Sequence, residues 1–396
     1  MELYKDLITV KKKKEDISII DLGYNSIKVS TYSIYKNGHY KKKDQQQEYV
    51  QIGYNLYKNN NIIKYQNIER TIEFLNKIKN NLKQMKINTV IPIATSAVRD
   101  ADNMYDVVNT IKKNSGFEFN ILSGFEEGFF SYFGAQSIMR VPDGIFFDLG
   151  GGSIEIIHVQ NYKIKKIICM NLGALRLSEK FGKFNENLEE EERATGYKHL
   201  EKYLYKNIPG IDQFDINKTL NMKLVGIGGI IRAIYKFISK IFQNSQSFSY
   251  NHVIMTKKII DLSNNIFKSL SQEELLQIKF IDAQRSKTIT TGSFVVKILM
   301  EKLGFDNILI CPSGLREGIL ENYLYFDMNK KYRLRKKFIG LNYDDISSII
   351  YSNNLDRFSE FGINPHPNPL FGSLKGHGEN FPKKILSAKV NKIAKK

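Results

Sequence analysis

The sequence contains only two cysteines, Cys169 and Cys311, among 396 residues. Two thiols are too few for a disulfide framework or for a cysteine-rich zinc site, so we expect a reducing compartment, the cytoplasm. The six histidines are scattered along the chain and show no metal-ligand spacing. These scarcities exclude the disulfide-rich secreted class and give no sign of a zinc centre.

Long apolar runs are also missing. Lys11–Lys14 are followed by Glu15 and Asp16, and not by the apolar core of a signal peptide. Leu224–Ile234 is apolar, but it is short and contains Arg232. We therefore expect a cytoplasmic protein without a membrane span.

Acidic residues are in short supply. Lys and Arg number 59 against 41 Asp and Glu, which gives a formal net charge of +18. Such a surplus favours a polyanionic partner, because clustered cations raise the local concentration of phosphate groups. Nucleic acid, polyphosphate, phosphorylated nucleotides and acidic membranes all fit, and so does a lysine-rich composition without functional meaning. The charge alone does not choose among them.

Alternating apolar and glycine-rich segments predict an α/β protein with an internal repeat. Ile17–Ile20 and Ile27–Tyr32 read as two strands joined at Asp21–Ser26, and residues 144–160 repeat this pattern. We expect further strands at 89–94, 117–122, 223–225 and 307–311, and helices over 68–85, 101–113, 126–139, 188–206, much of 271–304, and 315–325. Residues 36–48 read as a solvated loop or a sheet edge.

Each half of the repeat contains a turn suited to phosphate. In the first, Asp21 ends a strand beside Gly23, and Asn25 and Ser26 add side-chain donors. In the second, three consecutive glycines follow Asp148 in the segment Asp148–Glu155, and such a run forms a nest of N–H groups. Its two carboxylates suit a divalent cation that holds phosphate oxygens. Glycine turns are common, so it is the pairing of the two that points to function.

Three other segments carry charge or glycine at element ends. Glu126 and Glu127 begin a helix, where acids ordinarily stabilise the helix dipole, although one could orient a water. Arg99 follows a strand and could neutralise phosphoryl charge, although a lone arginine is ordinarily a surface residue. Gly226–Gly229 lies between a strand and a helix, an arrangement typical of anion sites.

Six segments occur in the order seen in the exopolyphosphatase / guanosine pentaphosphate phosphatase (Ppx/GppA) family, and the chain resembles its short form without the C-terminal HD-type domain. They are Asp21–Ser26, Ala94–Asn103, Ser123–Glu127, Asp148–Glu155, Asn171–Leu177 and Gly314–Gly318. The resemblance covers residues 17–325. It implies two actin-like (ribonuclease H-like) ATPase-fold domains, 1–138 and 139–314, with a cleft between them and helix 315–325 packing back on the first. Residues 328–396 are then a basic C-terminal extension, either a solvated tail or a polyanion-binding arm.

The resemblance also implies roles for individual residues. Glu127 corresponds to the carboxylate that activates water, Arg99 meets the substrate phosphates, and Asp148 and Glu155 hold Mg²⁺, with Glu155 also serving catalysis. The residues that match the family's phosphate loops are Gly23, Asn25, Ser26, Gly151, Gly152 and Ser153. We also expect Gly228 to bind phosphate, because Gly226–Gly229 lies between a strand and a helix. The chain departs from the family at Tyr24, which could narrow the first turn, at Ile227 and Ile230, which lack hydroxyl groups, and at Lys287, where an aspartate is usual.

The implied activity is release of terminal orthophosphate from inorganic polyphosphate. The alternatives are the same chemistry on guanosine pentaphosphate (pppGpp) and non-catalytic, regulatory binding of polyphosphate. A sugar kinase of the actin-like fold fits poorly, and no P-loop exists, because the one Gly-Lys pair, Gly182–Lys183, precedes Phe184. A homodimer is compatible with the sequence, and nucleic-acid binding through the basic C-terminal residues stays open.

Overall fold

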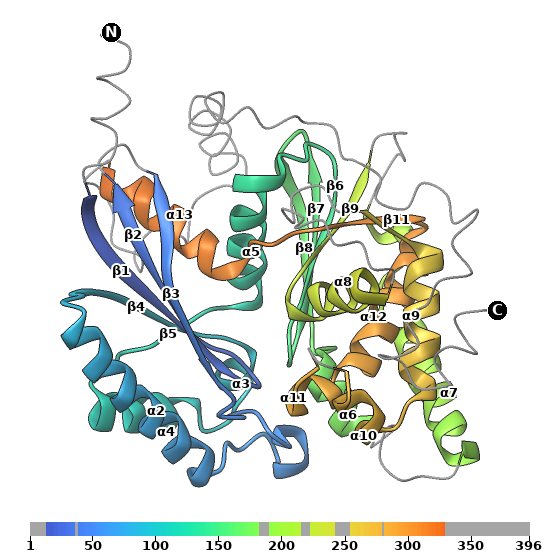
Figure 1. Ribbon diagram of the computed structural model, residues 1–396, viewed down its shortest axis with the longest axis horizontal. Coiled ribbons are helices and arrows are strands. Elements are labelled where there is room, and N and C mark those ends of the chain that lie inside the picture. The colour runs from blue at the N-terminus through green and yellow to red at the C-terminus, as the bar shows by residue number, and fades with distance from the viewer. Residues whose placement is uncertain are drawn as a thin grey trace, which may run out of the picture. The chain divides into compact units, whose positions relative to one another are not determined.

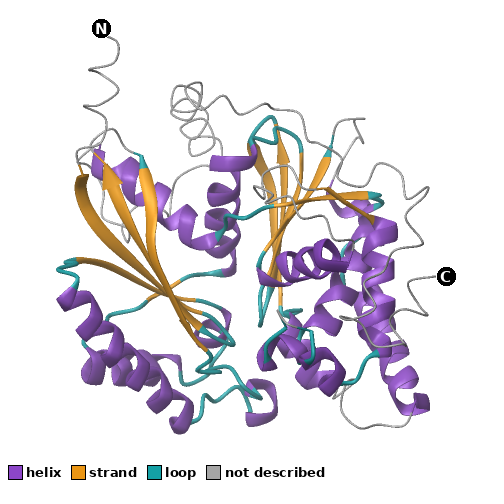
Figure 2. Ribbon diagram, in the orientation of Figure 1, coloured by secondary structure: helices purple, strands orange, loops and turns teal. Residues whose placement is uncertain are grey.

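The computed structural model describes residues 13–35, 39–181, 190–214, 222–241, 254–278 and 281–328. These residues form an α/β protein with two mixed sheets (Figures 1 and 2). The described residues up to Glu127, together with those from Ile319, make up one compact unit, and Gly128–Gly318 makes up the other. Apart from residue 328, the expected basic extension over 328–396 lies outside the described residues.

Unit 1 is built on a five-stranded sheet with the order β3-β2-β1-β4-β5. The strand pairs β1–β2 and β2–β3 are antiparallel, whereas β1–β4 and β4–β5 are parallel. Its strands are β1 (Lys13–Leu22), β2 (Ile27–Tyr35), β3 (Tyr40–Glu48), β4 (Thr89–Ala94) and β5 (Asn120–Ile121), and its helices are η1 (Leu56–Asn59), α2 (Tyr65–Gln84), α3 (Ser96–Arg99), α4 (Met104–Ser115) and the end of α13 (Leu315–Met328).

Unit 2 is built on a six-stranded sheet with the order β10-β11-β9-β6-β7-β8. Its strands are β6 (Gly144–Leu149), β7 (Ile154–Gln160), β8 (Lys163–Met170), β9 (Lys223–Ile227), β10 (Ile254–Thr256) and β11 (Asn307–Ile310). Its helices are most of α5 (Gly124–Met139), α6 (Ala174–Phe181), α7 (Glu190–Asn207), η2 (Ile211–Phe214), α8 (Gly229–Ile241), α9 (Lys257–Ser269), α10 (Gln272–Leu276), α11 (Ala283–Ser286) and α12 (Ile289–Leu303).

The predicted internal repeat is confirmed by the strand pairing. Read from β8, the second sheet has the order β8-β7-β6-β9-β11, and the first has the order β3-β2-β1-β4-β5. In both, the first two strand pairs are antiparallel and the next two are parallel. In both sheets the opening hairpin ends at a glycine turn, and its first strand pairs in parallel with a later strand. Each sheet therefore carries one glycine turn, at the carboxyl end of β1 in the first sheet and of β6 in the second.

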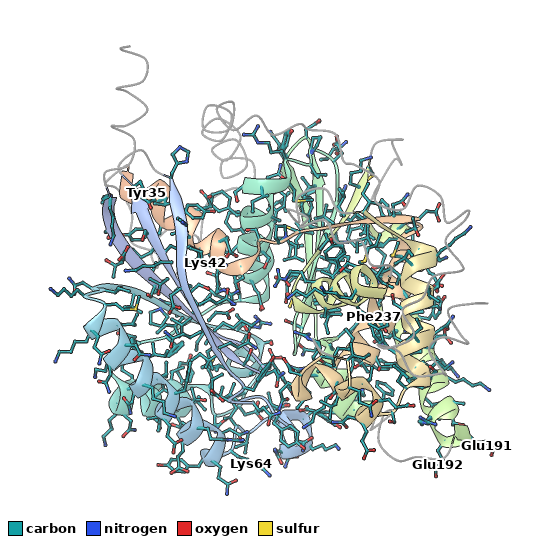
Figure 3. All side chains as sticks on the ribbon, in the orientation of Figure 1. Tyr35, Lys42, Lys64, Glu191, Glu192 and Phe237 are labelled. Carbon is teal, nitrogen blue, oxygen red and sulfur yellow. The ribbon has the colours of Figure 1, made fainter. Side chains whose placement is uncertain are left out.

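Side-chain patterning explains these elements. Helix α2 buries Ile68, Leu75, Ile78 and Leu82, which recur at helical spacing. Strand β6 is buried on both faces, and Tyr132 of α5 meets Phe146 edge-on with ring centroids 5.0 Å apart. In the helical layer of unit 2, Phe237 points into the interior, whereas Glu191 and Glu192 project from α7 (Figure 3).

Of the two alternatives for residues 36–48, the sheet edge is confirmed over 40–48, which form the edge strand β3. Its exposed lysines protect the edge from further pairing. Two other expectations need correction. The strand expected over 117–122 shrinks to Asn120–Ile121. The helical segment 271–304 breaks into three helices, because Ser271 and Glu274 form a capping box that starts α10 and Asp282 caps α11.

Strand β8 was not predicted, because Lys163, Lys165 and Lys166 give it a polar appearance. Among the described helices, none is both long enough and apolar enough to cross a membrane.

Helix α5 packs unusually closely on the segment that leads into α13. A Cβ at Gly134 would lie 2.1 Å from the carbonyl oxygen of Gly314 and 2.6 Å from the amide nitrogen of Gly318. Real atoms do not approach this closely, so a side chain at Gly134 would force the two backbones apart.

We expect Gly134→Ala to lower the free energy of unfolding by roughly 1–3 kcal/mol, the usual result of overpacking. Ser137→Ala, one turn along the same helix, is the control. It removes a single hydrogen bond to the Gly134 carbonyl and is expected to cost about 1 kcal/mol or less. Chemical denaturation gives the free energy of unfolding of each variant. Equal values for Gly134→Ala and Ser137→Ala would contradict the close packing at Gly134.

Candidate active site

The same backbone hydrogen bond closes both glycine turns. The Gly23 amide donates to the Ser26 carbonyl at 3.0 Å in unit 1, and the Gly150 amide donates to the Ser153 carbonyl at 3.0 Å in unit 2. The two turns are thus built alike, although their side chains differ. At the positions flanking each turn, Asp21 pairs with Lys28, whereas Asp148 pairs with Glu155.

The first turn of α6 holds the carbonyl groups of the unit 2 turn. The amides of Gly173, Ala174, Leu175 and Arg176 donate to the carbonyls of residues 150–152 over 2.9–3.2 Å. A Cβ at Gly173 would lie 2.3 Å from the Gly152 backbone, so only glycine permits this contact. Within the described chain, the amides of Gly151, Gly152 and Ser153 donate to no backbone acceptor. These three N–H groups suit an anion.

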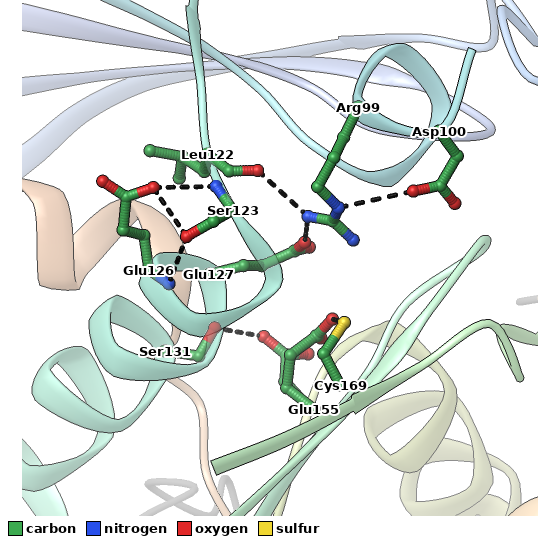
Figure 4. Close-up of polar contacts among 10 residues, drawn as sticks. Arg99, Asp100, Leu122, Ser123, Glu126, Glu127, Ser131, Glu155 and Cys169 are labelled. Atoms are coloured by element: carbon green, nitrogen blue, oxygen red, sulfur yellow. Dashed lines mark hydrogen bonds and ion pairs between the residues drawn. The ribbon is translucent and has the colours of Figure 1, made fainter. Parts of the chain in front are cut away.

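Asp148 and Glu155 face each other across β6 and β7 as direct partners in the antiparallel ladder. Glu155 is 1% exposed. Ser131 of α5 donates to Asp148 Oδ2 at 2.5 Å, and the Cys169 thiol of β8 donates to Glu155 Oε1 at 3.2 Å (Figure 4). Directly opposed side chains have Cβ atoms roughly 5 Å apart, and like charges at this spacing destabilise a sheet.

This donor set fits Mg²⁺. Magnesium binds through one or two carboxylates and completes its shell with water and phosphate oxygens. A cation would also offset the repulsion within the pair. In the described part of the chain, no cluster of three or more His, Cys, Asp or Glu side chains has metal-binding geometry.

Gly228 lies against the end of β6. Its φ of +106° is strained for any residue with a side chain, and a Cβ there would be 2.6 Å from the Leu149 carbonyl and 3.0 Å from Asp148 Oδ1. Beside it, a Cβ at Gly229 would be 2.8 Å from the Arg285 guanidinium. The third glycine segment thus borders the Asp148 carboxylate and brings an arginine to the start of α8.

In unit 1, Arg99 and Glu127 form an ion pair. Arg99 Nη1 donates to Glu127 Oε2 at 2.7 Å and to the Leu122 carbonyl at 3.1 Å, and Arg99 Nε lies 3.4 Å from Asp100 Oδ1 (Figure 4). Both partners are mostly buried, at 17% and 11% side-chain exposure. The pair fixes the orientation of the Glu127 carboxylate.

The adjacent acids Glu126 and Glu127 have different structural roles. Glu126 accepts hydrogen bonds from the amide and hydroxyl of Ser123, and its own amide donates to the Ser123 hydroxyl, which is a capping box. Glu127 instead contacts Arg99. Glu127 is the last residue of unit 1 and Gly128 the first of unit 2, and both lie in α5.

The unit 1 turn is held by a loop that the sequence did not single out. The amides of Gln51 and Gly53 donate to the carbonyls of Asn25 and Tyr24 at 2.9 and 3.0 Å. The Tyr24 ring is buried against Gly53, so it packs into the interior of unit 1. The expected narrowing of the turn by Tyr24 stays a prediction.

Ser26 is buried in this turn, and Asn25 Oδ1 is buried without a hydrogen-bond partner among the described residues. Rotating the amide by 180° places a donor at that point. An amide donor there suits a phosphate oxygen.

The Ppx/GppA phosphatase family model matches residues 36–325. The chain belongs to the Ppx/GppA phosphatase family. The predicted family is thereby confirmed. Ser131 and Cys169, which contact the carboxylate pair, lie outside the six family segments, and for them the sequence offered no signal.

Curated relatives of this Ppx/GppA member carry several names. A bifunctional 3-dehydroquinate synthase/phosphatase of Fusobacterium nucleatum is 27% identical over 76% of this chain, which spans only 46% of that relative's length. Exopolyphosphatase 1 of Mycobacterium tuberculosis is 19% identical over 77% of this chain and 87% of the relative. A guanosine-5'-triphosphate,3'-diphosphate pyrophosphatase of Vibrio atlanticus is 22% identical over 66% and 50%.

Solved structures show the same fold. An exopolyphosphatase from Cytophaga hutchinsonii superposes with a TM-score of 0.66 at 19% identity, covering 78% of this chain and 98% of the other. The Aquifex aeolicus Ppx/GppA enzyme gives a TM-score of 0.59 at 25% identity, covering 78% and 99%. The predicted two-sheet α/β fold of the family is confirmed.

We expect Gly173→Ala to lower kcat/KM for phosphate release about 100-fold, because the added Cβ displaces the glycine turn by a distance comparable to 1 Å. Gly210→Ala is the matched control, since a Cβ there meets the Asp212 carboxylate, which can rotate away. Steady-state kinetics with thermal melts compare the two. Unchanged kinetics in Gly173→Ala would show that α6 does not control the turn.

Proposed function

We propose that this chain is an exopolyphosphatase, which hydrolyses terminal orthophosphate from inorganic polyphosphate with Mg²⁺. The observation that carries the proposal is the opposed pair Asp148 and Glu155 beside a glycine turn with three available amides. Two carboxylates and a nest of N–H groups together suit a metal-bound phosphate chain. Membership in a phosphatase family supports hydrolysis as the reaction.

In the proposed reaction, a water oxygen attacks the terminal phosphorus in line with the bridging oxygen that leaves. Glu127 accepts a proton from this water, and Arg99 keeps the Glu127 carboxylate in place and meets the phosphoryl oxygens. The products are orthophosphate and a chain one phosphate shorter.

The backbone amides of the unit 2 turn, together with Gly23, Asn25, Ser26 and Gly228, hold the phosphate chain in this proposal. When bound at Asp148 and Glu155, Mg²⁺ supplies charge neutralisation at the phosphate oxygens. The proposal requires that Glu127 and the carboxylates of unit 2 act on the same phosphate, and the expected cleft stays a prediction.

Polyphosphate is favoured over a nucleotide by the chemistry of the third glycine segment. Ile227 and Ile230 are buried and offer no hydroxyl to a ribose, whereas Arg285 adds positive charge beside Gly229. The net charge of +18 also favours a long polyanion. The second candidate is hydrolysis of pppGpp, supported by the name of the Vibrio atlanticus relative.

The third candidate is non-catalytic binding of polyphosphate, which needs the turns but not Glu127. A cytoplasmic location stays part of the proposal, supported by the small number of cysteines. A homodimer and nucleic-acid binding stay predictions.

We expect Glu127→Gln to lower kcat about 10²–10⁴-fold, because the carboxamide cannot accept the proton. Glu126→Gln makes the same chemical change one residue away and should leave kcat intact, since glutamine also completes a capping box. Phosphate-release assays compare the two variants. Equal activities would remove Glu127 from the mechanism.

Assays with purified protein should give a kcat/KM for polyphosphate at least roughly tenfold above that for pppGpp, about 1.4 kcal/mol in transition-state stabilisation. The reverse ratio would assign the second candidate. Tight binding of polyphosphate without phosphate release from either substrate would assign the third.

A further inference from the structure

Four side chains from four elements of unit 2 form a chain of contacts around the carboxylate pair. Asp148 of β6 is the ladder partner of Glu155 of β7, and Glu155 is the ladder partner of Cys169 of β8. Ladder partners project from the same face of a sheet. Ser131 reaches Asp148 from α5, and Cys169 reaches Glu155 from the strand beyond it.

The surroundings leave Glu155 little freedom. Its side chain is almost fully buried, and a buried carboxylate is costly unless hydrogen bonds or cations satisfy its oxygens. Helix α5 presents Gly128 above it, where a Cβ would be 3.3 Å from Glu155 Cβ and 2.9 Å from Ile167 Cγ2. The helix thus approaches the sheet closely because Gly128 has no side chain, and a residue with one would disturb this contact.

We propose that Ser131 and Cys169 are positioning residues for the carboxylate pair. Ser131 engages Asp148 Oδ2 and Cys169 engages Glu155 Oε1, and each hydrogen bond holds its carboxylate in one orientation toward a divalent cation. Groups that hydrogen-bond metal-binding carboxylates fix their orientation and raise affinity for the metal. The inference rests on the proposed function, because the cation belongs to it.

The competing explanation for Cys169 is simple packing, because a cysteine behaves as a small apolar residue. Two substitutions separate the explanations with opposite expectations. Cys169→Ser keeps a donor and loses apolar character, whereas Cys169→Val keeps apolar volume and loses the donor. For Ser131, threonine keeps the hydroxyl and alanine removes it.

The test is Mn²⁺ binding without substrate, measured by the electron paramagnetic resonance signal of free Mn²⁺. We expect Cys169→Val and Ser131→Ala to weaken the affinity about 10–100-fold. Cys169→Ser and Ser131→Thr should stay within about threefold of the unmodified protein, because each keeps a donor. The Mg²⁺ concentration for half-maximal activity should rise in Cys169→Val and Ser131→Ala, the two variants that lack a donor. Should Cys169→Val fail to fold, Cys169→Ala also lacks the donor and serves in its place.

Two outcomes would overturn the inference in different ways. If Glu155→Gln abolishes Mn²⁺ binding but Cys169→Val and Ser131→Ala bind it normally, the positioning role is wrong and the proposed cation site stands. If the unmodified protein binds no Mn²⁺, or Glu155→Gln leaves binding unchanged, the cation site of the proposed function fails and the positioning role fails with it.

Discussion

Two carboxylates directly opposite each other on neighbouring strands are the constraint on which unit 2 depends. Asp148 and Glu155 are ladder partners, and Glu155 lies out of reach of bulk water. Two ionised carboxylates at this spacing would repel each other. Strand β6 is flanked by β7 and β9, so the two backbones that carry the pair cannot separate without breaking the sheet. A buried charge must be satisfied locally. Donors from Ser131 and Cys169 supply part of that stabilisation, and the proposed divalent cation would add to it.

Backbone amides of the glycine turn in unit 2 provide partial positive charge beside the two carboxylates. The start of α6 engages the carbonyls of the glycine turn, which leaves the amides of Gly151, Gly152 and Ser153 for a ligand. This explains why the family segment Asn171–Leu177 accompanies the glycine segment, although it contributes no obvious chemistry in sequence. Fixed amide dipoles need little reorganisation when charge develops on a phosphate, so such a turn suits both binding and catalysis.

Local patterns in the sequence predict the features that depend on neighbours along the chain. The two strand–turn–strand units and helix α2 follow from apolar spacing and glycine. Features that depend on distant residues do not follow. The division of roles between Glu126 and Glu127 is decided by Ser123 on one side and by Arg99, 28 residues away, on the other. The contact of Cys169 with Glu155 depends on β8, which was not predicted because its lysines interrupt the apolar pattern of a strand.

The most direct test is a crystal structure of the protein grown with Mn²⁺, with diffraction recorded at the manganese absorption edge. The account predicts an anomalous peak bound by oxygens of Asp148 and Glu155 beside the glycine turn. Mn²⁺ bound only elsewhere, with both carboxylates satisfied by protein groups alone, would contradict it.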